Sequence, residues 1–230
     1  MTENLKIENI VQPIKLGHVN IYLVKTDVGY ILVDTGMPNA AKKFDQALRT
    51  YGVEADQVSL IILTHGHLDH VGAVAQVKAL TGGKILCHRS FAEDLSNGKF
   101  ENATPQNLVG RIFNLMTGLL GSGIDPAIAD IVVDDEYDLE EFGISGKVIH
   151  TPGHSQSSIS IILDHGEALV GDLIREEKPG KIGFGMFYED RDTALESVKK
   201  IATFTARIIY LSHSTIIDNQ ILNKFIAANQ

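Results

Sequence analysis

The sequence places four side chains that commonly bind metal ions within six residues, in the motif His65-Gly66-His67-Leu68-Asp69-His70. His65 and His67 are two residues apart, so in an extended chain they project to the same side. Asp69 and His70 follow in a tight turn that enters a helix, where adjacent side chains diverge. One short loop can therefore serve two neighbouring ions. Imidazole and carboxylate ligands together suit zinc, iron or manganese better than calcium.

Three further candidate ligands lie far along the chain, each at the end of a predicted strand. His154 ends the run Thr-Pro-Gly-His, Asp172 follows Gly171, and His213 comes after the apolar run 207–211. In open sheets that contain parallel strands, sites gather where strand ends meet loops, so these residues are expected to converge on one sheet edge. A chance cluster of exposed histidines is the alternative, and the matching placement of the later residues argues against it.

Apolar runs and turn residues predict the elements that position these side chains. Strands are expected at 20–24, 30–33, 58–63, 84–88, 147–150, 159–163, 168–170 and 207–211, with hairpin turns at 27–29 and 164–166. Helices are expected after Pro38, from about Leu68 to Leu80, over 193–204 and over 217–228. Hairpins mixed with strand-helix units predict mixed sheets with helices packed outside them.

The segment 90–132 interrupts this alternation and is predicted to be a helical insertion. It carries two adjacent apolar stripes at helical spacing: Leu108, Ile112, Leu115 and Leu119, and Val109, Phe113, Met116 and Leu120. So wide an apolar face has three interpretations, which are helices packed on the core, a lid that caps the site, or a homodimer surface. The apolar face also suits a substrate with an apolar acyl part.

Length and composition predict a single globular domain over residues 1–230. Hydrophobic residues make up 44% and charged residues 21%, close to the averages of soluble globular proteins. The formal net charge of −9 argues against nucleic-acid binding, which needs a basic surface. No apolar run approaches the roughly 20 residues of a membrane helix, the start shows no leader, and the lone Cys87 suits a reducing compartment. We therefore predict a cytoplasmic protein without membrane or nucleic-acid partners.

Taken together, the motifs resemble the metallo-β-lactamase superfamily, in the same order and over nearly the whole chain. They are HxHxDH, Thr-Pro-Gly-His, Gly-Asp and the C-terminal histidine, with Val33-Asp34-Thr35-Gly36 upstream. The resemblance implies a four-layer αββα sandwich of two mixed β-sheets, with helices outside and a binuclear metal site at the sheet edge. It assigns to one metal His65, His67 and His154, and to the other Asp69, His70 and His213, with Asp172 as the bridge.

The resemblance also implies how such a centre works. Two cations that share a carboxylate and a solvent oxygen lower the pKa of bound water towards about 7, polarise the attacked carbonyl and stabilise the leaving group. Two zinc ions are the expected cofactors, with iron or manganese as alternatives. Asp69 is the expected catalytic residue, which accepts a proton from the attacking hydroxide or orients it. Asp34 either holds a ligand histidine by its other N–H or caps the turn before Pro38.

Individual positions indicate the branch of the superfamily. Asp172 stands where the best-known zinc β-lactamases resemble one another in carrying cysteine, so the chain looks closer to the glyoxalase II and lactonase-like branches. It departs from the lactonases at Arg175, where they typically carry tyrosine. Ser212 and Ser214 replace the glycines that commonly flank the last histidine, and only 17 residues follow it, whereas glyoxalase II enzymes usually add a helical domain.

The leading prediction is a metal-dependent hydrolase that cleaves an ester, thioester or lactone of a small metabolite. A mononuclear-iron oxidoreductase similar to the persulfide dioxygenases is the main alternative. An RNA nuclease, which the net acidity disfavours, and a β-lactamase are less favoured members of the same superfamily. The remaining histidines lack a partner spacing and are predicted to be structural or solvent-facing: His18, His88, His150 and His165.

Overall fold

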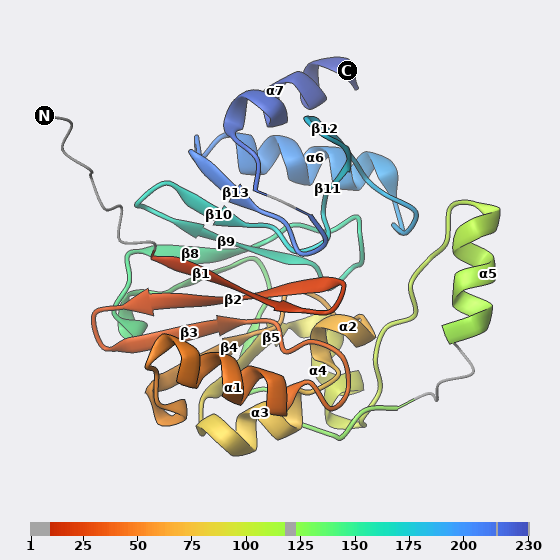
Figure 1. Cartoon of the computed structure of the whole chain (residues 1–230). Helices are drawn as coiled ribbons and strands as arrows, with labels where there is room; N and C mark the ends of the chain where they lie inside the picture. The colour runs from red at the N-terminus through yellow and green to blue at the C-terminus, as the bar shows by residue number, and fades with distance from the viewer. Residues whose placement is uncertain (1–9, 118–122, 215, 230) are drawn as a thin grey trace, which may run out of the picture.

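The computed structural model describes residues 10–117, 123–214 and 216–229. Two β-sheets face each other, and helices cover the outer face of each (Figure 1). The first sheet contains, in spatial order, β1 (Val11–Leu16), β2 (Val19–Thr26), β3 (Gly29–Val33), β4 (Val58–Ile62), β5 (Lys84–His88) and β6 (Ile131–Val133). The pairs β1–β2 and β2–β3 are antiparallel, and the strands from β3 to β6 pair in parallel. The first sheet is therefore mixed, as the sequence predicts.

The second sheet has the spatial order β13 (Ile208–Tyr210), β10 (Glu167–Leu169), β9 (Ile159–Leu163), β8 (Gly146–His150) and β7 (Glu136–Asp138). In this second sheet β10 and β13 pair in parallel, and the other neighbouring strands pair antiparallel. A separate hairpin of β11 (Arg175–Lys178) and β12 (Lys181–Gly183) follows β10 in the chain. Both predicted hairpins, β2–β3 and β9–β10, are confirmed.

Seven α-helices occur in the described residues: α1 (Ala41–Tyr51), α2 (Leu68–Val71), α3 (Val74–Thr81), α4 (Arg89–Ser96), α5 (Leu108–Thr117), α6 (Arg191–Ala202) and α7 (Asn219–Ala228). Short 3-10 turns lie at Ala55–Gln57 and Glu140–Phe142. Helices α1 and α3 cover the first sheet, and α6 and α7 cover the second (Figure 1). Within the described residues, no helix is long and apolar enough to cross a membrane.

Three apolar clusters separate the four layers. One lies between the sheets and includes Val24, Ile62 and Ile161, and the two others lie between each sheet and its helices. Because both faces of the central strands are buried, these strands are apolar at nearly every position, as in β4. Phe44 of α1 is fully buried, and a side chain of this size stabilises the fold by about 1.5–3 kcal/mol. The predicted αββα sandwich is confirmed.

The helix expected from Leu68 to Leu80 is broken into two. The one-turn helix α2 ends at Val71, and Ala73 lies outside helical backbone geometry before α3 begins. Pro38 packs against Gly72 so closely that a Cβ atom there would lie 2.4 Å from the Pro38 nitrogen. The break lets α2 carry Asp69 and His70 at the sheet edge while α3 packs along the first sheet.

The insertion forms α4 and α5, and α5 projects from the body of the molecule (Figure 1). Leu108, Ile112 and Leu115 are 71%, 51% and 75% exposed, so packing of this stripe on the core is the wrong interpretation. Leu119 and Leu120 lie outside the described residues. The lid and the dimer surface remain predictions.

Candidate metal centre

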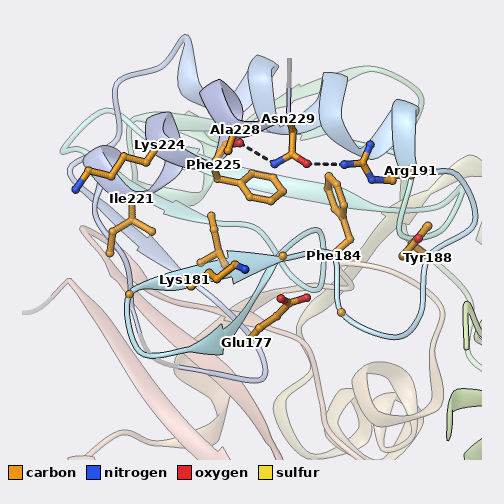
Figure 2. A pocket seen from close by; sticks show the side chains of 14 residues that line it. Glu177, Lys181, Phe184, Tyr188, Arg191, Ile221, Lys224, Phe225, Ala228 and Asn229 are labelled. Atoms are coloured by element: carbon orange, nitrogen blue, oxygen red, sulfur yellow. Dashed lines mark hydrogen bonds between the residues drawn. The ribbon is translucent and has the colours of Figure 1, made fainter.

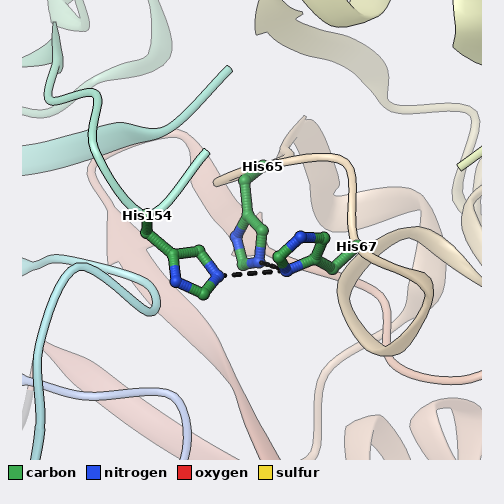
Figure 3. Close-up of side chains that lie close together, drawn as sticks. All are labelled: His65, His67 and His154. Atoms are coloured by element: carbon green, nitrogen blue, oxygen red, sulfur yellow. Dashed lines mark hydrogen bonds between the residues drawn. The ribbon is translucent and has the colours of Figure 1, made fainter. Parts of the chain in front are cut away.

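Three histidines from two separate loops point at one another beside the sheet edge (Figure 3). His65 and His67 follow β4, and His154 lies in the loop between β8 and β9. The Nδ1 atom of His67 lies 3.0 Å from His65 Nε2 and 3.0 Å from His154 Nε2. Ligand nitrogens around one tetrahedral zinc ion lie about 3.3 Å apart, because each is 2.0–2.1 Å from the metal. The three side chains therefore fit one ion.

The other four predicted ligands lie beside this group. Asp69 and His70 come from α2, Asp172 follows β10, and His213 follows β13. The Nε2 atom of His213 is 3.0 Å from Asp172 Oδ2 and 3.3 Å from Asp69 Oδ2. Asp172 Oδ2 is also 3.8 Å from His154 Nε2, so this carboxylate lies between the two groups, as a bridge requires. The structure thus brings all seven predicted ligands to one place.

Two buried atoms in this centre lack a hydrogen-bond partner within the described part of the chain. They are His70 Nε2 and Asp172 Oδ1, and they lie 3.5 Å apart. Buried polar atoms are nearly always hydrogen-bonded, and leaving one unpaired costs about 1–3 kcal/mol. A cation bound between this imidazole nitrogen and this carboxylate oxygen would explain why neither atom has a hydrogen-bond partner. The donor set therefore fits a second metal ion.

Hydrogen bonds on the far side of the imidazoles fix their orientation. His70 Nδ1 lies 2.8 Å from Asp34 Oδ2, His154 Nδ1 lies 2.9 Å from the Phe187 carbonyl, and His213 Nδ1 lies 3.0 Å from the His18 carbonyl. Metal-binding histidines usually donate their second N–H in this way, which sets the tautomer and the direction of the ring.

Asp34 joins two parts of the centre. It accepts hydrogen bonds from the Thr64 backbone N–H and hydroxyl, at 2.8 Å and 3.0 Å, as well as facing His70. The structure places it here and not at a helix cap, since the cap residue of α1 is Ala40. Its backbone φ of 65° is unfavourable for a residue with a side chain. Strain of this kind is typical of functional sites, where the surrounding contacts hold the residue in place.

The three clustered histidines are neutral at neutral pH. Burial and the neighbouring His154 lower the pKa of His67 to about 3. Burial and the adjacent histidines lower the pKa of His65 well below its usual range, and burial also lowers the pKa of His154. A neutral imidazole is the form that binds a metal, so this group is ready to bind without losing protons.

The carboxylate-rich half has the opposite charge state. Burial opposes protonation of His213, but Asp172 and Asp69 outweigh it and raise its pKa to about 10. Burial likewise opposes protonation of His70, and Asp172 and Asp34 nevertheless raise its pKa well above the usual value. The cationic histidines in turn hold the pKa of both Asp69 and Asp172 well below the usual range, although burial acts the other way. Metal-free protein therefore carries two protonated imidazoles here.

If the centre binds two ions, this asymmetry predicts different pH dependences for the two binding steps. Binding at the second position must displace protons from His70 and His213, so its affinity should rise between pH 6 and 9, by about tenfold per pH unit for each proton displaced. The first step should change little over this range. Calorimetric titration of metal-free protein in buffers of different ionisation enthalpy measures both. Equal pH slopes for the two steps would contradict the charge states described above.

Comparison with known proteins places the chain in a family. Residues 14–213 match the sequence profile described as "Metallo-beta-lactamase superfamily", which is most of the chain. The chain belongs to the metallo-β-lactamase superfamily. Members of this superfamily are mostly metal-dependent hydrolases, so the predicted family and the predicted class of enzyme agree with the match. The match itself does not specify a branch.

Several curated proteins are similar over most of the chain. "Probable metallo-hydrolase YflN" of Bacillus subtilis is 26% identical over 220 residues, which cover 84% of this chain and 80% of that protein. "Beta-lactamase-like protein 2 homolog" of Caenorhabditis elegans is 29% identical, with coverages of 90% and 59%. "Atrochrysone carboxyl ACP thioesterase" of Aspergillus fumigatus is 26% identical, and the chain spans 53% of its length.

Solved structures share the fold. The crystal structure of the BLEG-1 B3 metallo-β-lactamase superposes with a TM-score of 0.72 at 24% identity, covering 94% of this chain and 99% of that one. ST1585 of Sulfolobus tokodaii superposes with a TM-score of 0.68 at 19% identity, covering 95% and 85%. At these identities the likeness establishes the metallo-β-lactamase fold and leaves the substrate open.

Glu101 supports the centre, although no spacing in the sequence indicated it. Its Oε2 atom accepts hydrogen bonds from the Gly66 N–H at 3.0 Å and from the Ser157 hydroxyl at 2.8 Å, and its own N–H donates to the Gly66 carbonyl. Gly66 lies between two predicted ligands, His65 and His67, and Ser157 lies in the loop of His154. Glu101 therefore joins the two histidine loops to the segment between α4 and α5.

Replacing Glu101 by alanine should lower the free energy of unfolding by about 1–3 kcal/mol, because buried polar groups of both loops lose a charged acceptor. Glu101→Gln keeps one acceptor oxygen and should recover part of the loss. Denaturant unfolding of both variants measures this, with the exposed Glu93→Ala in α4 as a control. If Glu101→Ala were no less stable than that control, the proposed tie between the loops would be wrong.

The loop 184–188, which follows β12, contacts two different parts of the molecule. Phe184 and Tyr188 line a pocket of about 500 Å³ together with Arg191 of α6 and Phe225 of α7 (Figure 2). None of the seven predicted metal ligands lines this pocket. Phe187, in contrast, supports His154 through its carbonyl.

The remaining candidates are placed as follows. Cys87 is buried, and burial raises the pKa of its thiol to about 12, which leaves it unsuited to act as a nucleophile. His88 and His150 stack on each other at 4.0 Å, and His165 is exposed in the β9–β10 turn. His18 is exposed, as predicted, but its Nε2 atom also lies 3.1 Å from Asp69 Oδ2 at the centre.

Proposed function

We propose that this protein is a metal-dependent hydrolase that cleaves an ester, thioester or lactone bond of a small metabolite at a binuclear centre. The observation that carries the proposal is the convergence of seven ligand side chains, with His70 Nε2 and Asp172 Oδ1 buried and unpartnered within the described residues. Two divalent ions bound there would supply a water of lowered pKa and an electrophile that polarises the substrate carbonyl. The metals we propose are two zinc ions, with iron or manganese as alternatives.

Asp69 is the residue to which we assign proton transfer. Its side chain is 21% exposed, so it reaches the opening of the centre, and its carboxylate stays ionised because its pKa is held low. The Oδ2 atom faces the imidazoles of His18 and His213, so Oδ1 is the oxygen we expect to take the proton from the attacking water. The single cysteine of the sequence, Cys87, is buried, so the proposal does not use a cysteine nucleophile.

The acyl portion of the substrate is proposed from two features. One relative is named as a thioesterase, and α5 exposes the apolar side chains of Leu108, Val109, Ile112 and Leu115. The segment before α5 is joined to the loop that supports His154, since the Gln106 N–H donates to the Met186 carbonyl and Pro105 pairs with Phe187. An acyl chain that lies along α5 would therefore have its carbonyl end near His154.

Hydrolysis by the metal-loaded protein tests the proposal. A panel should include short- and long-chain acyl thioesters, a p-nitrophenyl ester series and a γ-lactone, assayed with zinc, manganese and iron. We expect turnover of at least one class, removed by a chelator and restored by metal. Oxygen uptake with a persulfide substrate by iron-loaded protein, without hydrolysis of the panel, would replace this proposal by the dioxygenase alternative. Equal turnover of charged and acyl-chain esters would remove the acyl preference alone.

A further inference from the structure

The loop between β1 and β2 brings a histidine of its own to the metal centre. His18 Nε2 lies 3.1 Å from Asp69 Oδ2, and the same oxygen lies 3.3 Å from His213 Nε2. One ligand atom from each of His18, Asp69 and His213 can be chosen so that all lie within 4.8 Å of one another. By the same measure, His70 groups with His65 and Asp172 instead. The outer part of the centre is therefore a set of three ligand-type atoms that includes His18.

The position of His18 is fixed by several contacts that do not involve its ring. Its carbonyl accepts a hydrogen bond from His213 Nδ1 at 3.0 Å. Two residues further on, the Asn20 N–H donates to the Ser212 carbonyl at 2.7 Å and the Asn20 side chain donates to the Ser214 carbonyl at 3.1 Å. The β1–β2 turn and the loop of His213 are thus joined on both sides of His213, and they form one unit.

The ring of His18 is held as well. It stacks on the His213 ring with centroids 5.6 Å apart and an angle of 5° between the planes. Its side chain is 59% exposed, so it approaches the centre from the solvent side, whereas His70 is fully buried. The carbonyl, the ring face and the Nε2 atom of His18 all contact proposed metal ligands. An exposed histidine placed there by chance would not be expected to make all three contacts.

We propose that His18 is an additional ligand of the second metal position, beside Asp69, His70 and His213. The ligand chemistry is that of a borderline divalent cation such as Zn²⁺ or Co²⁺, which accepts imidazole nitrogen and carboxylate oxygen in the same shell. The inference rests on the binuclear centre of the proposed function. It adds a residue from the N-terminal hairpin to a ligand set otherwise drawn from the strand ends further along the chain.

Stepwise titration of metal-free protein with Co²⁺ tests this assignment. Visible absorption follows each binding step in competition with a chelator, on the full chain and with no substrate present. His18→Ala should weaken the second step by about tenfold or more and change its absorption spectrum, while the first step stays within twofold of wild type. His18→Gln should show the same loss, because it keeps a hydrogen-bond donor to Asp69 and lacks the imidazole. His165→Ala, an exposed histidine in a distant turn, serves as the control and should match wild type.

Three outcomes would overturn the assignment. The first is a second binding step of unchanged affinity in His18→Ala, and the second is wild-type protein that takes up one ion only. The third is wild-type affinity in His18→Gln, which would show that His18 acts only as a hydrogen-bond donor. The failure of the proposed function is separate from these. It would appear as two bound ions, a second step weakened in His18→Ala, and no hydrolysis of any substrate by wild type.

Discussion

Replacing His67 by alanine should remove most of the hydrolytic activity while the fold survives. His67 Nδ1 is the atom that His65 and His154 both approach to 3.0 Å, so its loss would remove one of the three proposed ligands of the first metal position. Loss of a mere hydrogen-bond partner of a ligand lowers metal affinity or activity by about 10- to 100-fold, and loss of a ligand should exceed this. Activity with excess zinc and the number of bound ions measure the effect.

The fold should tolerate this change because His67 packs at the sheet edge and not in the apolar layers. Its cluster neighbours are other polar ligands, whereas the core depends on residues such as Phe44 and Ile62. His165→Ala is the matched control for loss of an imidazole and should keep full activity. Turnover by His67→Ala at the wild-type rate, with both ions bound, would remove His67 from the site.

Much of this site could be predicted from the sequence because strand ends determine where it forms. His65, His154, Asp172 and His213 each follow a strand, and the order of strands in a two-sheet sandwich brings those ends to one edge. The buried strands were recognisable because both their faces are covered and they are therefore apolar at successive positions. Fold and ligand set thus depend on the same local signals.

His18 and Glu101 could not be predicted in this way. Each is a single polar residue with no partner at a fixed spacing, and each reaches the centre through a contact across a large sequence separation, 51 residues for His18–Asp69 and 35 for Glu101–Gly66. Strands β1, β6, β7, β11 and β12 were also missed. Charged residues dominate β7 and β11, and β6 and β12 have three residues each, too few to show a period. Contacts of this kind are set by tertiary packing, which the local sequence does not encode.

Gly153→Ala should destabilise the fold more than Glu101→Ala does. Gly153 has a φ of +126°, and a Cβ atom there would lie 2.3 Å from both the nitrogen and the Cα of Ala194 in α6. Backbone strain and overpacking each cost about 1–3 kcal/mol, so we expect a loss of about 3 kcal/mol or more in the free energy of unfolding. Because His154 is the next residue, the first metal should also bind more weakly.

Gly52→Ala separates the two causes of this loss. Gly52 also has a positive φ, of +68°, but nothing lies within 4 Å of a Cβ atom there, and it ends α1 away from the centre. Its replacement should cost about 1 kcal/mol through backbone conformation alone and leave metal binding unchanged. Denaturant unfolding and zinc titration of the two variants give the comparison. Equal destabilisation by both would mean that the loop of His154 can move away from α6, and the close packing of Gly153 would then not be what positions His154.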